Sequence, residues 1–250
     1  MEKRILVGDD IFERLIRNNG YYVDKTELLY EIATESRNPV MLITRPRRFG
    51  KTLALSMMES FFDVNRDSRE LFREYSIARN HPRFCEEWMN QYPVLFLTLK
   101  DVDGLDFASA FDMFKRTLSS LCIKHAYLTG KEEVSPADRN TFLRMMNGEA
   151  SVTDIKYSLL VIMRMMKAVY GKPCILLIDE YDVPLARAAL RRNKAFYEQM
   201  LDLIRGFLSI SLKTNEYLQF AVKLPFPEAQ RKADFPLTPM GRPHREADSR

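Results

Sequence analysis

Short apolar runs bounded by turn residues alternate along the chain with longer stretches of helical periodicity. The runs occupy residues 38–44, 92–100, 173–182 and 216–222, and each predicts a β-strand. The run at 38–44 and the part of 173–182 before Asp179 are apolar without alternation, which is typical of strands buried on both faces of a parallel sheet. Strands that alternate with long helices predict an α/β domain whose sheet is mainly parallel.

Helical spacing of apolar residues predicts the helices between these strands. They are expected at residues 9–17, from Asp24 onward, at 53–62, at 106–128, from about 135 onward, at 151–171 and at 195–208. Asp24 followed by Glu27 matches a capping box, and Ser151 followed by Asp154 starts the long helix that ends at Gly171. The methionines at positions 163, 165 and 166 are predicted to pack in the core rather than bind a ligand.

The composition fits a globular protein and limits its chemistry. The 250 residues carry 38 lysines and arginines against 34 aspartates and glutamates, and the net charge of +4 is too small to indicate nucleic-acid binding by itself. The three cysteines form no C-x-x-C pair, so neither a zinc site nor a disulfide framework is predicted. Acidic residues near the start, and the lack of a run of about 20 apolar residues, predict a cytoplasmic protein without a membrane partner.

The segment TRPRRFGKT, residues 44–52, ends like a phosphate-binding loop but does not begin like one. The pattern G-x-x-x-x-G-K-[ST] is completed by Gly50, Lys51 and Thr52, whereas Arg45 stands in the position of its first glycine. A predicted strand precedes the segment and a predicted helix follows it, which is the context that such a loop requires. The predicted phosphate contacts are Arg47, Arg48, Phe49, Gly50, Lys51 and Thr52, and the Thr52 hydroxyl is also predicted to bind Mg²⁺.

A second candidate segment is CILLIDEYD, residues 174–182, in which an apolar run leads into Asp179 and Glu180. In nucleotide hydrolases an aspartate in this position holds Mg²⁺, and the adjacent glutamate can deprotonate the attacking water. Ligands of parallel sheets bind at the carboxyl ends of the strands, where both segments place their polar residues. Together the two segments predict an ATP site, with Asp179 as a metal ligand and Glu180 as the catalytic base.

Several other polar residues have a structural explanation beside a functional one. Asp182 either supports the metal shell or caps the turn that follows it. Arg187, Arg191 and Arg192 either sense a terminal phosphate or lie on a solvated helix face. The segment 21–26 either contacts adenine or forms only an extended piece and a helix cap. We prefer the structural explanation in each case.

Five segments of the chain together resemble the AAA-ATPase-like family of bacterial proteins. They are YYVDKTELL, ITRPRRFGKT, YPVLFLTLKDVDG, ILLIDEYDVPLA and IRGFLSISLKTNEYLQFAV, and the resemblance covers roughly residues 11–222. RPRRFGK[ST] is this family's own form of the Walker A loop, so Arg45 favours membership. The resemblance implies a P-loop NTPase-like three-layer fold, with Lys51 and Thr52 in the Walker A loop and Asp179 and Glu180 as the Walker B pair. It implies ATP binding more firmly than turnover.

The sequence departs from the family after residue 222. Residues 223–250 hold five of the twelve prolines and show no periodicity, so we predict a disordered or frame-shifted tail after a truncated P-loop domain at 1–222. The C-terminal PD-(D/E)XK nuclease-superfamily domain that full-length members usually carry does not follow. The resemblance also places strand 216–222 between the Walker A and Walker B strands and implies one further edge strand, which is missing. An exposed sheet edge would invite a protein partner or a second copy of the chain, so we expect marginal stability and slow hydrolysis.

Three functions follow from these observations. The leading hypothesis is an ATP-binding P-loop domain that hydrolyses ATP with Mg²⁺, as the N-terminal part of a larger ATPase–nuclease-like protein. The first alternative is a nucleotide-gated interaction module without useful turnover. The second is a basic nucleic-acid-binding fragment that uses the arginine-rich loop, and its binding would weaken steeply with salt and ignore ATP.

Overall fold

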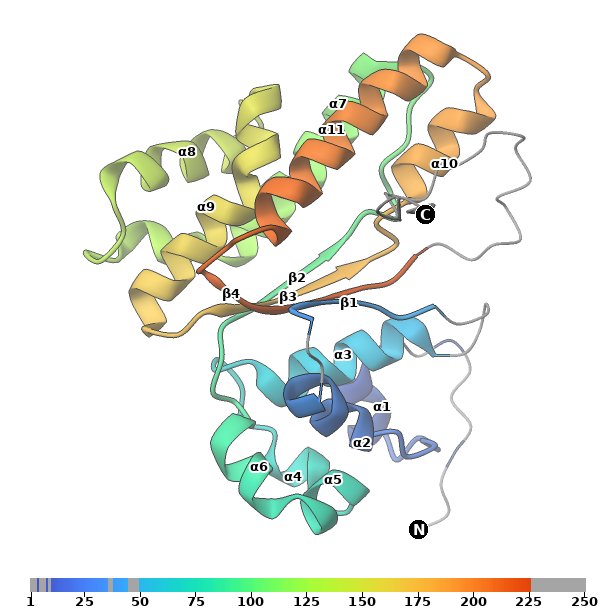
Figure 1. Cartoon of the computed structure of the whole chain (residues 1–250). Helices are drawn as coiled ribbons and strands as arrows, with labels where there is room; N and C mark the ends of the chain where they lie inside the picture. Colours follow the sequence, from blue (N-terminus) through green and yellow to red (C-terminus); the bar gives the residue numbers. More distant parts are fainter. Residues whose placement is uncertain (1–3, 5–7, 9, 36–37, 45–49, 226–250) are drawn as a thin grey trace, which may run out of the picture.

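Four parallel strands form a single sheet at the centre of the molecule, with helices on both of its faces (Figure 1). The computed structural model describes residues 4, 8, 10–35, 38–44 and 50–225. The strands are β1 (Val40–Leu42), β2 (Val94–Thr98), β3 (Cys174–Asp179) and β4 (Leu218–Lys223), and their order across the sheet is β1-β4-β3-β2. The parallel α/β sheet is confirmed, and its fourth strand lies between the first and the third as the family resemblance implies.

The helices form two layers around the sheet, which completes a three-layer fold (Figure 1). One layer contains α1 (Phe12–Arg17), α2 (Glu27–Tyr30), the π-helical turn η1 (Glu31–Glu35), α3 (Lys51–Phe62), α4 (Arg69–Phe72), α5 (Ser76–Asn80) and α6 (Pro82–Trp88). The other contains α7 (Phe107–Lys124), the 3₁₀ turn η2 (Ala126–Gly130), α8 (Pro136–Met146), α9 (Val152–Tyr170), α10 (Val183–Leu190) and α11 (Lys194–Leu212). None of the helices in the described part of the chain has both the length and the apolar character needed to cross a membrane.

Both ends of α9 are where the local sequence predicts them. The Ser151 hydroxyl accepts the N–H of Asp154, and the Asp154 carboxylate accepts the N–H of Ser151 in return. At the other end Gly171 has a φ of 71°, a left-handed conformation that favours glycine. These boundaries could be predicted because each depends only on residues within one helical turn.

The helix predicted to begin at Asp24 begins later. Helix α2 starts at Glu27 with Thr26 in the N-cap position, so the predicted capping box is wrong. The Asp24 carboxylate instead accepts the N–H groups of Thr26, at 2.9 Å, and of Ser76, at 2.7 Å. A bond from an aspartate to the backbone two residues later competes with helix capping, and here the contact with α5 favours it.

Two further elements differ from the prediction. The helix expected over residues 106–128 ends at Lys124, and the 3₁₀ turn η2 follows it. Strand β1 was expected to be buried on both faces, but the side chain of Leu42 is 52% exposed. Within the described residues no strand pairs with the outer side of β1, so it is an edge strand, whereas every residue of β3 is buried between two neighbours. A continuous apolar run does not distinguish these two positions.

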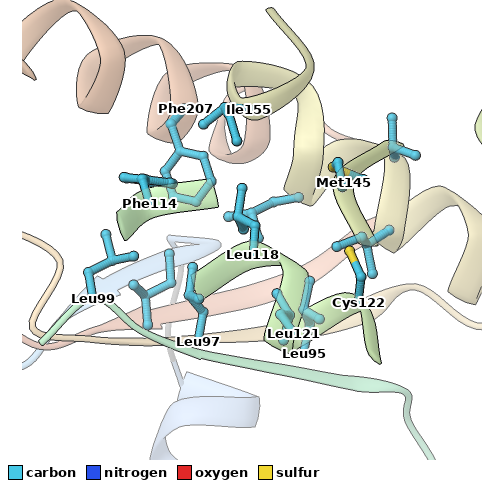
Figure 2. Close-up of a cluster of buried hydrophobic side chains, with 14 of the residues drawn as sticks. Leu95, Leu97, Leu99, Phe114, Leu118, Leu121, Cys122, Met145, Ile155 and Phe207 are labelled. Atoms are coloured by element: carbon cyan, nitrogen blue, oxygen red, sulfur yellow. The ribbon is translucent and has the colours of Figure 1, made fainter. Parts of the chain in front are cut away.

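The larger hydrophobic cluster fixes β2 and β3 beneath α7, α9 and α11. Figure 2 shows side chains from these elements, including Leu97, Phe114 and Phe207, gathered in one apolar cluster. The rings of Phe114 and Phe207 join α7 to α11 in a T-shaped contact, with centroids 5.2 Å apart. The three methionines of α9 at positions 163, 165 and 166 are buried in the same cluster, which confirms their packing role.

The carboxyl end of β4 stays attached to the sheet beyond the predicted end of the strand. Strand β4 includes Lys223, and the N–H of Leu224 then donates to the carbonyl of Ile178 at 2.9 Å. The N–H of Tyr181 donates in turn to the carbonyl of Leu224 at 3.3 Å, and Pro225 is buried. The remainder of the predicted tail, residues 226–250, lies outside the described residues.

Candidate functional site

The junction between β1 and α3 has the strand–loop–helix order that the sequence predicts. Gly50 occupies the N-cap position of α3 with φ 71° and ψ 33°, and Lys51 is the first residue of the helix. A Cβ atom at Gly50 would meet no atom of the described residues within 4 Å, so among them the backbone conformation, rather than a lack of space, favours glycine there. The start of α3 therefore lies at the edge of the sheet where the parallel strands have their carboxyl ends (Figure 1).

Thr52 and Asp179 meet at this edge although they are 127 residues apart in the sequence. Thr52 lies in the first turn of α3, and its Oγ1 donates a hydrogen bond to Oδ2 of Asp179 at 2.9 Å. Asp179 is the last residue of β3, it is only 4% exposed, and its carbonyl accepts the N–H of Leu99 at 3.1 Å. The fold thus brings together the two residues predicted to bind a metal ion.

Asp179 and Glu180 form an acidic pair whose charge the protein compensates only in part. Burial raises the pKa of the Asp179 carboxyl above its ordinary range, and the charges of Lys51 and Lys100 oppose this rise. Burial also raises the pKa of Glu180, the charge of Asp179 adds to the effect, and Lys51, Lys100 and Arg187 oppose it. Adjacent carboxyl groups with raised pKa values are typical of sites that bind a cation or transfer a proton.

The backbone at Glu180 adopts a conformation that glutamate rarely adopts. Its φ is 51°, in the left-handed region. Hydrogen bonds hold the chain on both sides, since the carbonyl of Asp179 accepts the N–H of Leu99 and the carbonyl of Glu180 accepts the N–H of Val183 at 3.1 Å. Such strain persists only where the surrounding structure fixes it, and it is concentrated at functional sites. The turn after β3 is therefore a fixed feature of this edge.

Lys51 reaches from α3 to the chain that follows β4. Its Nζ donates a hydrogen bond to the carbonyl oxygen of Pro225 at 2.7 Å. Sequence reasoning did not find Pro225 as a member of the site. The acceptor is a backbone carbonyl, which every residue has, so the type of residue at position 225 cannot predict this contact.

A family model described as "Predicted AAA-ATPase" matches residues 7–224. The chain belongs to this AAA-ATPase-like family. Membership confirms the resemblance seen in the sequence and supports a nucleotide-binding, ATPase-like role. A relative from Azotobacter chroococcum mcd 1, named "Uncharacterized protein in vnfD 5'region", is 25% identical over 221 residues. The alignment covers 88% of this chain and 36% of the relative, so the chain spans only part of that relative's length. No solved structure matches the chain.

Five of the residues predicted for nucleotide binding lie at one edge of the sheet in this AAA-ATPase-like domain. They are Gly50, Lys51, Thr52, Asp179 and Glu180. The other predicted phosphate contacts, Arg47, Arg48 and Phe49, lie outside the described residues and stay predictions. Arg45 also lies outside the described residues.

The donor atoms at this edge suit Mg²⁺. Thr52 offers a hydroxyl and Asp179 a carboxylate, and oxygen ligands of this kind are those that Mg²⁺ prefers. In the part of the chain that the structure describes, no group of three or more His, Cys, Asp or Glu side chains could hold a metal ion. Mg²⁺ usually keeps several waters and is bound by one or two carboxylates together with substrate phosphates, so a sparse set of protein ligands fits it.

Arg187 of α10, and Arg191 directly after that helix, join it to the loop after β2. Nη1 of Arg187 donates to the carbonyl of Val102 at 3.3 Å, and Nη2 of Arg191 lies 3.3 Å from Oδ1 of Asp103. The predicted solvated face therefore describes Arg191 and Arg192, which are exposed, better than Arg187, which is half-buried. At the start of the same helix, Asp182 occupies the N-cap position without a side-chain capping bond.

Of the two tyrosines upstream of the loop, Tyr22 has a structural role, whereas the side chain of Tyr21 is exposed. The hydroxyl of Tyr22 donates to Sδ of Met57 at 3.0 Å, and its ring packs edge-on against Phe12 and Tyr75. These contacts bury the ring in the layer that contains α1 and α3. They favour the structural explanation of this segment over adenine contact.

Proposed function

We propose that this AAA-ATPase-like domain binds Mg·ATP at the carboxyl edge of β1, β4 and β3, and that it hydrolyses the nucleotide. The observation that supports the proposal best is the hydrogen bond between Thr52 Oγ1 and Asp179 Oδ2. Thr52 belongs to the segment that the sequence predicts to be a phosphate-binding loop. Asp179 belongs to the segment predicted to be a strand that ends in acidic residues. Their meeting at the carboxyl edge of a parallel sheet is the arrangement that nucleotide sites of this class require.

Lys51 and the start of α3 would bind the phosphates. The first N–H groups of a helix have no partner within the helix, so those of the 12-residue α3 can donate to an anion. Lys51 would exchange the carbonyl of Pro225 for an oxygen of the β- or γ-phosphate. The exchange is favourable because a charged acceptor forms a stronger hydrogen bond with an ammonium group than a neutral carbonyl does.

Thr52 and Asp179 would hold Mg²⁺, which when bound neutralises negative charge on the β- and γ-phosphates. Their existing hydrogen bond already places the two oxygen ligands side by side. Asp179 is almost fully buried, and this burial raises the pKa of its carboxyl. A carboxylate in that environment gains from a nearby cation.

Glu180 would accept a proton from the attacking water. A general base works best when its pKa approaches the pH of the reaction, and burial together with the charge of Asp179 raises the pKa of Glu180 in that direction. Its backbone is fixed in a left-handed conformation, so only the side chain would have to adopt the geometry that proton transfer needs.

Thermal unfolding of the chain with and without Mg·ATP tests the proposed binding. At a ligand concentration of about a hundred times its dissociation constant, binding adds roughly 2.7 kcal/mol to the free energy of unfolding. Lys51→Ala should remove most of this gain. Lys172→Ala is the matched control, because Lys172 lies just before β3, at the opposite end of the strand from Asp179, and it should keep the gain. An unfolding transition that Mg·ATP does not shift in the parent chain would refute the proposal.

One observation favours a second function, a nucleotide-gated interaction module without useful turnover. Because Lys51 is bound to Pro225, a phosphate and the segment after β4 would compete for the same amine. The outer side of β1, which is an edge within the described residues, could then receive a protein partner or a second copy of the chain. Glu180→Gln distinguishes the two functions. It should abolish hydrolysis and spare binding in an ATPase, and it should change nothing measurable in a module that only switches.

A further inference from the structure

Lys100 leaves the sheet beside the acidic pair. Strand β2 pairs with β3 up to Thr98 and Asp179, and the N–H of Leu99 donates to the carbonyl of Asp179 at 3.1 Å. Lys100 is the next residue along the chain, and its N–H donates to the hydroxyl of Thr98 at 3.4 Å. The candidate site therefore has a lysine on each side. Lys100 follows β2 on one side, and Lys51 starts α3 on the other.

The loop that carries Lys100 is fixed to the body of the protein. The side chain of Val102 is fully buried, and its carbonyl accepts a hydrogen bond from Arg187 of α10. Asp103 pairs with Arg191, which directly follows the same helix, at 3.3 Å. A Cβ atom on Gly104 would lie 2.3 Å from the backbone nitrogen of Ala110, so the loop packs directly on the start of α7. The backbone of Lys100 is held close to Asp179 by these contacts.

The cations around Glu180 differ in whether they already donate a hydrogen bond to the protein. Three of them act on its carboxyl group, namely Lys51, Lys100 and Arg187. Lys51 donates to Pro225, and Arg187 donates to the carbonyl of Val102. Lys100 is exposed, and within the described residues its amine makes no hydrogen bond and no ion pair. Of these three cations, Lys100 is the one whose amine can bind a ligand without giving up a hydrogen bond or ion pair to a described residue.

A bound triphosphate would bring more negative charge next to two carboxylates. Lys51 approaches such a ligand from the side of α3, where the β-phosphate and one side of the γ-phosphate would lie. The other side of the γ-phosphate would face β3 and β2, where repulsion from Asp179 and Glu180 would be strongest. A cation on that side would lower the repulsion for a triphosphate and would matter little for a diphosphate.

We propose that Lys100 binds the terminal phosphate and makes this site selective for nucleoside triphosphates over diphosphates. The inference rests on the proposed nucleotide site, and it adds a specificity-determining residue that neither sequence motif contains. Thr98 and the contacts of the loop with α10 position Lys100, and the amine itself touches the ligand.

Equilibrium titrations with two nucleotides test this inference. The non-hydrolysable triphosphate AMP-PNP and ADP, each with Mg²⁺, are titrated into the parent chain and into the variants Lys100→Gln and Lys172→Gln. Loss of one charge-assisted contact should weaken AMP-PNP binding by about tenfold or more in Lys100→Gln, and should leave ADP binding within about twofold of the parent. Lys172→Gln removes the same charge at the amino end of β3 and should change neither affinity.

A fourth protein, Lys100→Arg, keeps the charge and should retain most of the preference for AMP-PNP. A merely structural role would move both affinities together, so the ratio of the two dissociation constants is the decisive quantity. If Lys100→Gln weakens both nucleotides equally, or weakens neither, the inference is wrong while the nucleotide site stands. If the parent chain binds neither nucleotide, the proposed function fails first, and the role of Lys100 fails with it.

Discussion

Thr52 Oγ1 donates a hydrogen bond to Asp179 Oδ2 at 2.9 Å, which joins the first turn of α3 to the last residue of β3. The bond gives a donor to a carboxylate that is almost fully buried, and a buried charge without a partner would be costly. It also keeps the two proposed metal ligands together before any nucleotide arrives, so the binding energy of the nucleotide would not be spent on bringing them together.

Replacing Thr52 tests whether this hydroxyl is a metal ligand. Thr52→Ala removes the hydroxyl, and Thr52→Ser keeps it. A lost ligand contact of the usual strength for charged groups corresponds to a decrease of about tenfold or more in the rate of Mg²⁺-dependent ATP hydrolysis. We expect this loss in Thr52→Ala and a rate close to that of the parent in Thr52→Ser, measured as phosphate release. Hydrolysis at the parent rate by Thr52→Ala would show that the hydroxyl does not act on the metal.

Asp179→Asn should stabilise the chain at neutral pH while it abolishes stabilisation by Mg·ATP. Burial raises the pKa of Asp179 in the folded state, so folding binds protons and this residue's contribution favours the folded state at low pH. That contribution is lost as the pH rises through the folded-state pKa. We therefore expect the advantage of Asp179→Asn to be near zero at about pH 4 and to reach on the order of 1 kcal/mol at pH 7. Urea unfolding at several pH values, without nucleotide, measures it.

Asp154 is the matched control for this experiment because its shift has the opposite sign. Its hydrogen bond from Arg144 lowers the pKa of the carboxyl to about 2. The ionised form therefore stabilises the fold above the ordinary pKa, and the contribution is lost as the pH falls. Asp154→Asn should destabilise the chain at pH 7. If the two variants changed the free energy of unfolding in the same direction, the raised pKa of Asp179 would be contradicted.

Gly50→Ala tests the left-handed turn at the start of α3. The φ of 71° disfavours any residue with a side chain, although there is open space for the added methyl group. We expect a loss of about 1 kcal/mol in the free energy of unfolding, since the cost is backbone strain alone. Gly130→Ala provides the control, because Gly130 also has open space but no positive φ. Similar losses in the two variants would show that the turn at Gly50 is not the cause.

The pH dependence of hydrolysis should report on Glu180. A base must be ionised to accept a proton, and burial and the charge of Asp179 raise the pKa of Glu180 above the ordinary value of 4.5. We expect kcat to fall on the acidic side with an apparent pKa above 4.5, measured with saturating Mg·ATP. Glu180→Gln should lose the activity, and with it this fall of kcat at acidic pH. A rate that stays constant down to pH 4.5 would exclude Glu180 as the base.

Arg164→Leu should destabilise the domain without changing the nucleotide site. Arg164 of α9 binds both carboxylate oxygens of Asp138, through Nε at 2.8 Å and through Nη2, and Asp138 is only 6% exposed. Removing Arg164, whose side chain is 40% exposed, leaves the buried carboxylate of Asp138 without this partner, at a cost of about 2 kcal/mol. Urea unfolding should show this loss, and Asp138→Asn in the same chain should recover part of it. A loss that Asp138→Asn does not reduce would mean that packing of the Arg164 stem, rather than the charge, accounts for the effect.

The sequence by itself determined the features that depend on neighbouring residues. Periodicity identified the four strands. The pattern of Ser151 followed three residues later by Asp154 identified the start of α9, because a cap involves only one helical turn. The motif residues were found for the same reason, since Gly50, Lys51 and Thr52 are adjacent, as are Asp179 and Glu180. The order of the strands came from the family resemblance, because periodicity shows which faces are buried but not which strands are neighbours.

Only the tertiary structure decided which distant groups meet. It made β1 an edge strand, directed the Asp24 carboxylate to Ser76 instead of a helix cap, and joined Lys51 to the carbonyl of Pro225. It also placed Lys100 beside Asp179 through a backbone bond between β2 and β3. These contacts involve backbone groups that are the same in every residue, or side chains whose partners are far away in sequence. No local pattern encodes such contacts, because they follow from how the packed layers align the strand ends.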